Sequence, residues 1–314
     1  HRSKLSENQR SDKLVALQEL STWDNLAGWN AAILWATISP ATAIEALPVL
    51  EKVALDQTDA SPNKSGNDPG KPDRTAVSEA MQHAALNAIS LVLSQADAIP
   101  LETRTKLSQR LQRPDLSVEQ RSELYLALAR FMSPASIPSL DRSLEISEQS
   151  AIAPKELRRA ALQACILHGH WFHSEQSQPN HPVGIHTFNP EEWPANIMQV
   201  RWDTDAEMRW NFGYWAALIH LSDAETILIS QLRDADRTVQ TKAIEHLGLI
   251  RSETALQVLK EYAARPAENL RVAAAKGLSS WGPMHLIPLK NDTSSAVRLE
   301  VAWGLGKTPT AESA

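Results

Sequence analysis

The sequence predicts an all-α protein, built as a right-handed α-α superhelix of about five or six antiparallel helix pairs with one long irregular insertion. Three stretches carry this prediction: residues 239–248, 270–278 and 297–306 align. Each has an aliphatic residue, a small or aliphatic residue four positions later, and a leucine four positions after that. The stretches start 31 and 27 residues apart, which is typical of helical-repeat arrays. A unit this short cannot bury its own apolar face, so it must stack on its neighbours.

The N-terminal part, residues 1–167, is expected to consist of helical repeats. Alanine and leucine recur at spacings of three and four, as in amphipathic helices. Ser117 with Gln120 forms a capping box, which predicts a helix start. Residues 57–75 contain no large apolar side chain, so we expect a mobile polar loop there. The expected helices are 12–20, 25–38, 41–55, 76–95, 100–112, 118–132, 136–146 and 154–167.

Residues 168–203 are expected to interrupt the array as an aromatic and histidine-rich insertion. The helical period is lost in this range and four prolines appear. A stretch of this length inside an array is more often functional or disordered than idle. Thr204 with Glu207 gives a second capping box, and a helix over residues 205–221 resumes the array. Residues 204–314 are then the C-terminal repeats, and we expect the whole chain to form one continuous solenoid.

A proline-containing run also recurs near the starts of expected helices. It reads Leu47-Pro48-Val49-Leu50, returns 90 residues later at Ile137, and returns in part 150 residues further on at Ile287. Both offsets are multiples of about thirty residues. Together with the aligned stretches, this pattern resembles the HEAT-like (armadillo-type) helical repeats. The resemblance is good over residues 222–306, partial over 101–167 and suggestive before 55.

Composition limits the function classes. The net charge of −6 and the pI near 6.0 argue against a nucleic-acid partner, because proteins that bind nucleic acids normally have a basic face. No stretch reaches the ~20 apolar residues of a membrane-spanning helix, so we expect no membrane insertion. The only cysteine, Cys165, lies in a helical pattern and is predicted to be buried. The chain begins at His1, which suggests a truncated or processed N-terminus and leaves the localisation open between cytoplasmic and exported.

Five of the ten histidines fall within nineteen residues of the insertion. Imidazole is a common ligand of transition metals, so His168, His170 and His173 are candidate metal ligands. On a helix, residues at i and i+2 point to opposite sides, so such a site needs a loop. The other reading is a polar, histidine-rich segment without a metal. We expect no cofactor, with a transition metal or a tetrapyrrole at this insertion as the alternative.

Half of the ten tryptophans fall between Trp171 and Trp215. Met208, Phe212, Trp215 and Ile219 form one helical stripe, which predicts core. The side chains outside this stripe could line a groove, because amphipathic aromatics are enriched at interaction hot spots. The alternative is that the insertion simply covers them. The candidate partner-binding residues are Trp171, Trp193, Trp202, Trp210 and Tyr214.

Charged side chains recur at second-helix positions, including Arg158, Arg271 and Arg298. We expect ion pairs between repeats, with acids such as Asp234 and Asp292. A charged ladder that grips a partner is the alternative. No catalytic motif is found in the sequence.

The most favoured function is therefore a non-enzymatic scaffold or adaptor that binds another protein or a peptide on its concave face and insertion. The alternative is a metal-, haem- or bilin-binding protein with its site in residues 168–215. The resemblance admits this alternative because similar short repeats occur in bilin lyases. DNA glycosylases, which form a distinct solenoid family, are disfavoured by the net charge of −6.

Overall fold

The computed structural model describes residues 7–22, 26–55, 79–95, 101–114, 116–129, 136–147, 150–176 and 193–307. The chain divides into two compact units, His1–Leu140 and Asp141–Ala314. Each unit is described by itself. That the two form one continuous solenoid stays a prediction, and the expected loop at 57–75 lies outside the described residues.

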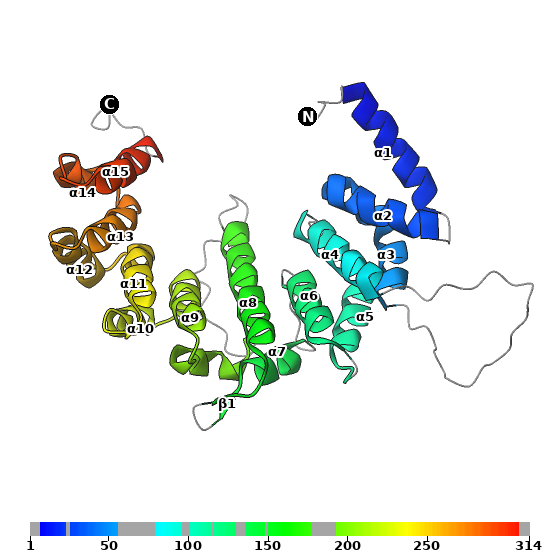
Figure 1. Cartoon of the computed structure of the whole chain (residues 1–314), viewed down its shortest axis with the longest axis horizontal. Coiled ribbons are helices and arrows are strands. Elements are labelled where there is room, and N and C mark those ends of the chain that lie inside the picture. The colour runs from blue at the N-terminus through cyan, green and yellow to red at the C-terminus, as the bar shows by residue number, and fades with distance from the viewer. Residues whose placement is uncertain are drawn as a thin grey trace, which may run out of the picture. The chain divides into compact units, whose positions relative to one another are not determined.

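Unit 1 consists of stacked helices (Figure 1). They are α1 (Glu7–Ser21), α2 (Leu26–Ile38), η1 (Pro40–Ala46), α3 (Leu47–Leu55), α4 (Glu79–Gln95), α5 (Leu101–Leu111), α6 (Val118–Leu128) and α7 (Ile137–Leu144), which runs across the division. Pro48 and Pro138 are each the second residue of their helix, where the missing amide N–H costs nothing. The capping box before α6 is confirmed, since Ser117 Oγ accepts from the Gln120 amide at 3.2 Å.

The core of unit 1 is aliphatic, with Leu50, Ile89, Leu107 and Leu124 fully buried. Trp35 is buried as well, and its Nε1 donates to Thr42 Oγ1 at 3.1 Å. Trp35 belongs to the core of unit 1 because α2 packs against η1, α3 and α4.

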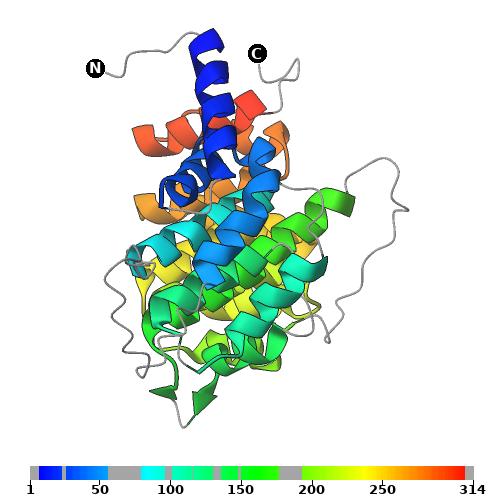
Figure 2. The same cartoon turned by 90° about the vertical axis from the view of Figure 1, so that its right-hand side faces the viewer.

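Unit 2 contains the best-developed repeats. Its helices are α8 (Lys155–Gln176), η3 (Ala195–Trp202), α9 (Ala206–Leu218), α10 (Ala224–Gln231), α11 (Arg237–Ile250), α12 (Glu253–Ala263), α13 (Glu268–Ser279), α14 (Pro283–Leu286), η4 (Ile287–Leu289) and α15 (Ser295–Lys307). The strands β1 (Ile146–Ser147) and β2 (Ser150–Ala151) form a short antiparallel hairpin that precedes α8 in the chain and is drawn as two arrows at the bottom of Figure 2. An all-α fold of stacked helix pairs is thereby confirmed.

The helices of unit 2 form two layers (Figure 1). The inner layer consists of α8, α9, α11, α13 and α15, each in contact with the next, and the outer layer of α10, α12 and α14. The core between the layers includes Leu228, Ile244, Leu259 and Leu278. Met208, Phe212, Trp215 and Ile219 are all buried, so the predicted core stripe is confirmed.

Small residues let the inner helices approach closely. A Cβ added at Gly248 on α11 would meet the backbone of Gly277 on α13, with only 2.7 Å to its Cα. A Cβ at Gly304 on α15 would lie 3.0 Å from the Cβ of Ser279 on α13. Neighbouring inner helices therefore cross at positions where a larger side chain has no room.

Two expectations about the interruption were wrong. The helix expected to end at residue 167 is α8, which continues to Gln176 and includes positions 168–176 of the expected insertion. It continues because its face still packs: a Cβ at Gly169 would lie 3.1 Å from Leu218 on α9. The cap of α9 is Asp205, whose carboxylate accepts from the Glu207 amide at 3.2 Å, and not Thr204.

Candidate protein-binding face

Polar and aromatic side chains run across the inner layer of unit 2 from α8 to α15. We name this set the inner row. It consists of His170 on α8, Trp210 and Tyr214 on α9, Lys242, Glu245 and His246 on α11, Lys276 on α13 and Glu300 on α15. Each helix of the layer contributes at least one side chain that contacts a member on the next helix, as the following distances show.

The aromatic half of the inner row joins α8, α9 and α11. Tyr214 Oη and His170 Nε2 form a hydrogen bond of 2.8 Å. The Tyr214 and His246 ring centroids lie 5.0 Å apart, and those of Trp210 and His246 lie 6.2 Å apart. Trp210 and Tyr214 are one helical turn apart on α9, so His246 packs against both. The predicted ridge of Trp210 and Tyr214 is thus present and half-buried.

His246 is a buried polar group within this aromatic half. Only 8% of its surface is exposed, and its Nδ1 has no hydrogen-bond partner among the described residues. Burial, and then the nearby Lys242 ammonium, lower the pKa of His246 to about 3. The imidazole is therefore neutral near neutral pH, and this half of the row carries no charge at His246.

The charged half of the inner row joins α11, α13 and α15. The Glu245 carboxylate forms ion pairs with the Nζ of Lys242 at 2.7 Å and with the Nζ of Lys276 at 3.3 Å. Lys276 in turn lies 3.9 Å from Glu300. Lys242 also connects the two halves, because its Nζ lies 5.8 Å from the Trp210 ring centroid. The face thus presents aromatic surface beside accessible ionic groups.

Acid is expected to destabilise unit 2 through His246. Its pKa falls from 6.5 to about 3 on folding, so the unfolded chain binds more protons between those two pH values. The free energy of unfolding therefore carries no penalty from His246 above about pH 6.5. Below that pH it falls by about 1.4 kcal/mol per pH unit, until the pH reaches the folded-state pKa. His246→Phe should remove this part of the pH dependence in urea titrations between about pH 4 and about pH 7. Equal acid slopes in both proteins would contradict the assignment.

Two other predicted partner-binding tryptophans, Trp193 and Trp202, lie outside the inner row. Trp193 is only 6% exposed and packs edge-on against Trp215 and His168, both at 5.3 Å, so the structure places it in the core. It is buried because residues 193–202 fold down beside α9 through η3. Trp171 lies on α8, but its side chain is outside the described part of the chain.

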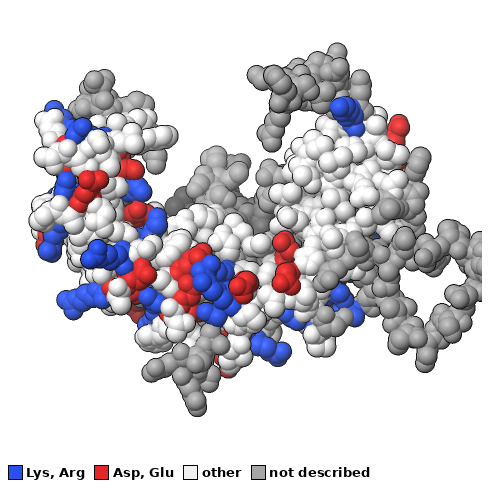
Figure 3. Space-filling model, viewed as in Figure 1, with Lys and Arg blue, Asp and Glu red and all other residues white. Residues whose placement is uncertain are grey.

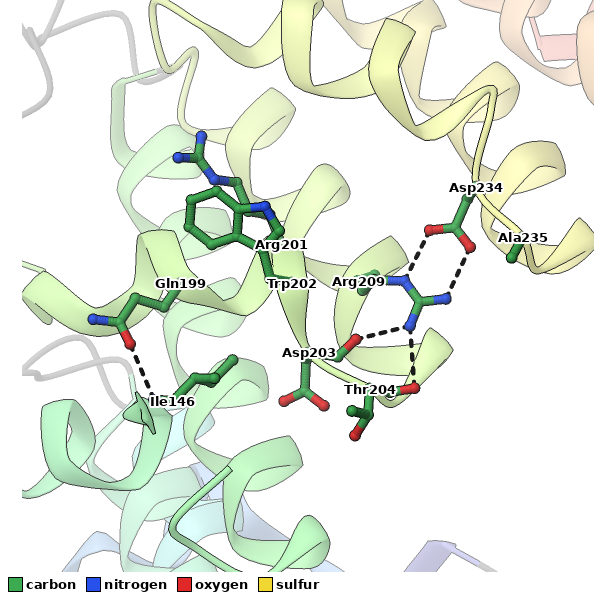
Figure 4. A pocket seen from close by; sticks show the side chains of 9 residues that line it. All are labelled: Ile146, Gln199, Arg201, Trp202, Asp203, Thr204, Arg209, Asp234 and Ala235. Atoms are coloured by element: carbon green, nitrogen blue, oxygen red, sulfur yellow. Dashed lines mark hydrogen bonds and ion pairs between the residues drawn. The ribbon is translucent and has the colours of Figure 1, made fainter. Parts of the chain in front are cut away.

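Trp202 lies at an open depression of about 940 Å³ on the edge formed by the helix-joining turns (Figure 4). It is 62% exposed, and the Arg201 guanidinium lies 3.7 Å from its ring centroid. The far wall holds the ion pair of Arg209 and Asp234. No residue that lines this depression belongs to the inner row, so Trp202 and Trp210 do not share one groove.

Ion pairs connect successive repeats along this edge, as predicted. Arg271 binds Asp292 with two hydrogen bonds of 2.9 Å, whereas Arg298 donates to the backbone carbonyls of Asp292 and Thr293. Arg209 binds Asp234 in the same bidentate way at 2.8 Å, which lowers the pKa of that carboxyl. Positive and negative side chains accordingly lie next to one another on the visible face of unit 2 (Figure 3). Arg209 and Arg271 are each paired with a carboxylate, which favours the structural interpretation over a charged ladder that binds a partner.

Two of the predicted metal ligands, His168 and His170, contact different neighbours. His168 is buried against Trp193, while the exposed His170 bonds to Tyr214. The side chain of His173 lies outside the described residues. Within the described ranges, no three His, Cys, Asp or Glu side chains are grouped so that they could hold a metal ion. The metal or tetrapyrrole alternative stays an untested prediction.

Sequence reasoning missed Lys242, Glu245, His246 and Lys276. A signal was available, because Tyr214, Glu245 and Lys276 are spaced 31 residues apart, and Trp303 follows after 27 more. These are the same offsets as those of the aligned repeats. Equivalent positions on stacked inner helices face the same side, so the row could have been traced from Tyr214.

Two further properties concern the chain as a whole. Among the described helices, none combines the length and the hydrophobicity that a membrane-spanning segment needs. Cys165 is buried, and burial raises the pKa of its thiol, as expected for a small apolar core residue.

The layers of paired helices and the ion pairs between them define a helical-repeat protein. Residues 195–279 match the family model of HEAT repeats. This part of the chain is therefore made of HEAT repeats, as its sequence pattern predicted. No characterised protein matches the sequence itself.

Several solved structures are distantly similar. The complex of CpcE and CpcF of phycocyanin lyase from Nostoc sp. PCC7120 shares 14% identity at a TM-score of 0.44, covering 97% of this chain and 95% of that chain. Kap95p bound to RanGDP shares 17% identity at a TM-score of 0.43, covering 99% of this chain and 42% of that chain. Human deoxyhypusine hydroxylase shares 13% identity at a TM-score of 0.31, covering 95% of this chain and 97% of that chain. Such distant similarities assign no function to this chain.

Proposed function

We propose that this chain is a non-enzymatic scaffold that binds a protein or a peptide on the inner row of unit 2. The observation that carries the proposal is the cluster of Trp210, Tyr214 and His246. Two half-buried aromatic side chains there cover a neutral imidazole whose Nδ1 has no partner among the described residues. Aromatic anchors of this kind dominate the energetics of protein interfaces.

The charged half of the inner row indicates which chemical groups the partner should carry. An extended segment that crosses from α9 to α13 would place an apolar or aromatic residue on Trp210 and Tyr214. It would then bring polar or charged residues to Lys276 and Glu245, whose side chains are partly exposed. Exposed ion pairs contribute little to stability, so exchanging them for pairs with a partner costs little. The proposed ligand is thus a peptide with an aromatic anchor followed by ionic residues.

Trp210→Ala is expected to weaken such binding at least about tenfold, because truncating a central aromatic anchor typically costs more than 1 kcal/mol. The measurement is calorimetric titration with peptides selected from a displayed random library against the wild-type chain. Tyr214→Ala and Lys276→Ala, which alters an exposed side chain, extend the test to variants with smaller effects on folding.

The matched control is Trp202→Ala, which removes an exposed tryptophan from the edge depression. It should leave the affinity unchanged. Peptides that lose affinity with Trp202→Ala but not with Trp210→Ala would move the site to the edge. A library that yields no binder to the wild-type chain would contradict the proposal altogether.

A further inference from the structure

The edge depression is lined by one cation whose charge no described carboxylate neutralises. Two carboxylates line the depression, and each is already bound by a guanidinium. Asp203 is paired with Arg158, and Asp234 is paired with Arg209. Arg201 also lines the depression, on the opposite side from Arg209 and Asp234 (Figure 4), and it forms no ion pair with any residue that the structure describes. The depression therefore offers one positive charge to an incoming group.

Arg201 and Trp202 form a joint contact surface at the end of η3. The Arg201 guanidinium lies 3.7 Å from the Trp202 ring centroid, so it is held over one face of the ring. A guanidinium in this position still has N–H groups along its edge, and a carboxylate can accept two of them. The ring itself is 62% exposed, which leaves room for an apolar side chain. The two side chains together suit a ligand that carries a carboxylate next to an apolar group.

The charges around the edge depression also favour an acidic ligand. Arg233 and Arg237, on the turn before α11, are exposed, and neither forms an ion pair within the described residues. The acid between them, Asp236, is half-buried and accepts from the Thr238 amide at 2.7 Å as the cap of α11. Glu145, next to β1, is half-buried as well. Charges beyond about 10 Å are screened at about 0.1 M salt, so the nearby cations outweigh the net charge of −6 on the whole chain.

The same charges favour a short acidic segment over a nucleic acid. Proteins that bind a nucleic-acid backbone present a broad basic face, because they neutralise many phosphates. The edge depression instead has carboxylates in its own walls and only a few exposed guanidinium groups around it. Its volume of about 940 Å³ is large enough for a few residues of a peptide. A few carboxylates on such a peptide would match these cations.

We propose that the edge depression binds a short acidic segment of a partner protein, with a carboxylate on Arg201 and an apolar side chain on Trp202. This site shares no residue with the inner row, so either site can be lost while the other is kept. The ligand chemistry differs too, because the inner row offers exposed charges of both signs and the edge depression offers positive ones.

The first experiment is a fluorescence-anisotropy titration with a labelled peptide that has a central phenylalanine flanked by glutamates. The wild-type chain should bind this peptide with a dissociation constant below about 1 mM. Arg201→Glu should weaken the binding at least about tenfold, because a repulsive charge replaces an attractive one. Trp202→Ala should also weaken it, because the apolar contact is lost. Both changes alter exposed side chains, so the circular dichroism spectrum should stay the same.

The matched control is Lys260→Glu, which reverses the charge of an exposed residue on the outer helix α12. This variant, and Trp210→Ala in the inner row, should bind the acidic peptide as the wild-type chain does. Three results would each overturn the proposal: no binding to the wild-type chain, equal binding of a peptide with lysines in place of the glutamates, or unchanged binding to Arg201→Glu. Tighter binding of single-stranded DNA than of the acidic peptide would overturn it as well.

The second experiment locates the bound peptide by photo-crosslinking, with benzoylphenylalanine in place of its phenylalanine. Trypsin cleaves after Arg201 and Arg209, so an adduct at Trp202 appears in the fragment 202–209. We expect the adducts in this fragment. Adducts confined to α11 and α13 would assign the peptide to the inner row and contradict a separate site at the edge.

Discussion

Gly248→Ala is expected to destabilise unit 2 by about 3 kcal/mol relative to Gly306→Ala, because the added methyl group overpacks a helix crossing. The new Cβ would meet the backbone of Gly277, with 2.7 Å to its Cα and 2.9 Å to its carbonyl carbon. A backbone cannot rotate away as a side chain can, so α11 and α13 must separate. The measurement is urea unfolding followed by far-UV circular dichroism.

Gly306→Ala is the matched control, since it makes the same change near the end of α15, where a Cβ meets nothing described within 4 Å. Both variants gain the helix propensity of alanine, about 1 kcal/mol, so the difference between them reports the helix crossing alone. Equal stability of the two variants would show that α11 and α13 do not cross at Gly248.

Asp203→Ala is expected to destabilise unit 2 by about 3–5 kcal/mol, the usual result of leaving one member of a buried ion pair without its partner. Arg158 donates to the two carboxylate oxygens of Asp203 at 2.9 and 2.8 Å. The side chains are only 8% and 1% exposed. Asp203 also accepts from the amide of Asp205 at 2.8 Å, which helps to position the start of α9. The ion pair of Arg158 and Asp203 therefore connects α8 to the turn before α9.

The double variant Arg158→Met with Asp203→Leu provides the control, because it removes both charges and keeps apolar volume. It should be more stable than Asp203→Ala, since neither charge is left buried alone. The measurement is again urea unfolding. A loss below about 1 kcal/mol for Asp203→Ala, or a double variant less stable than the single one, would contradict a buried and coupled pair.

The fold could be predicted from the sequence because similar residues recur in it at nearly constant offsets. Val239, Leu270 and Val297 recur at the repeat offsets, and these offsets alone require stacked helices. The end of α8 could not be predicted in the same way. Its histidines and glycine read as loop composition, but His168 packs against Trp193 and Gly169 faces Leu218. Tertiary packing between helices overrode the local signal.

The candidate site was predicted only in part, for a similar reason. Trp210 and Tyr214 could be separated from the core stripe by helical periodicity. Trp193 could not be assigned, because its burial depends on how residues 193–202 fold against α9. Gly248 and Gly306 both follow a leucine at the end of an aligned stretch. A Cβ at Gly248 would meet the backbone of the next inner helix, whereas a Cβ at Gly306 meets nothing described within 4 Å. Identical local sequence thus carries different roles at different places in the stack.

The central claim is that the inner row of unit 2 binds a protein or a peptide. Hydrogen exchange of the chain, with and without a selected peptide, tests it most directly. We expect slower amide exchange in α9 and α11, around Trp210, Tyr214 and His246, and unchanged exchange in the outer helices α10 and α12. Protection confined to the outer helices, or to the turns around Trp202, would contradict the claim.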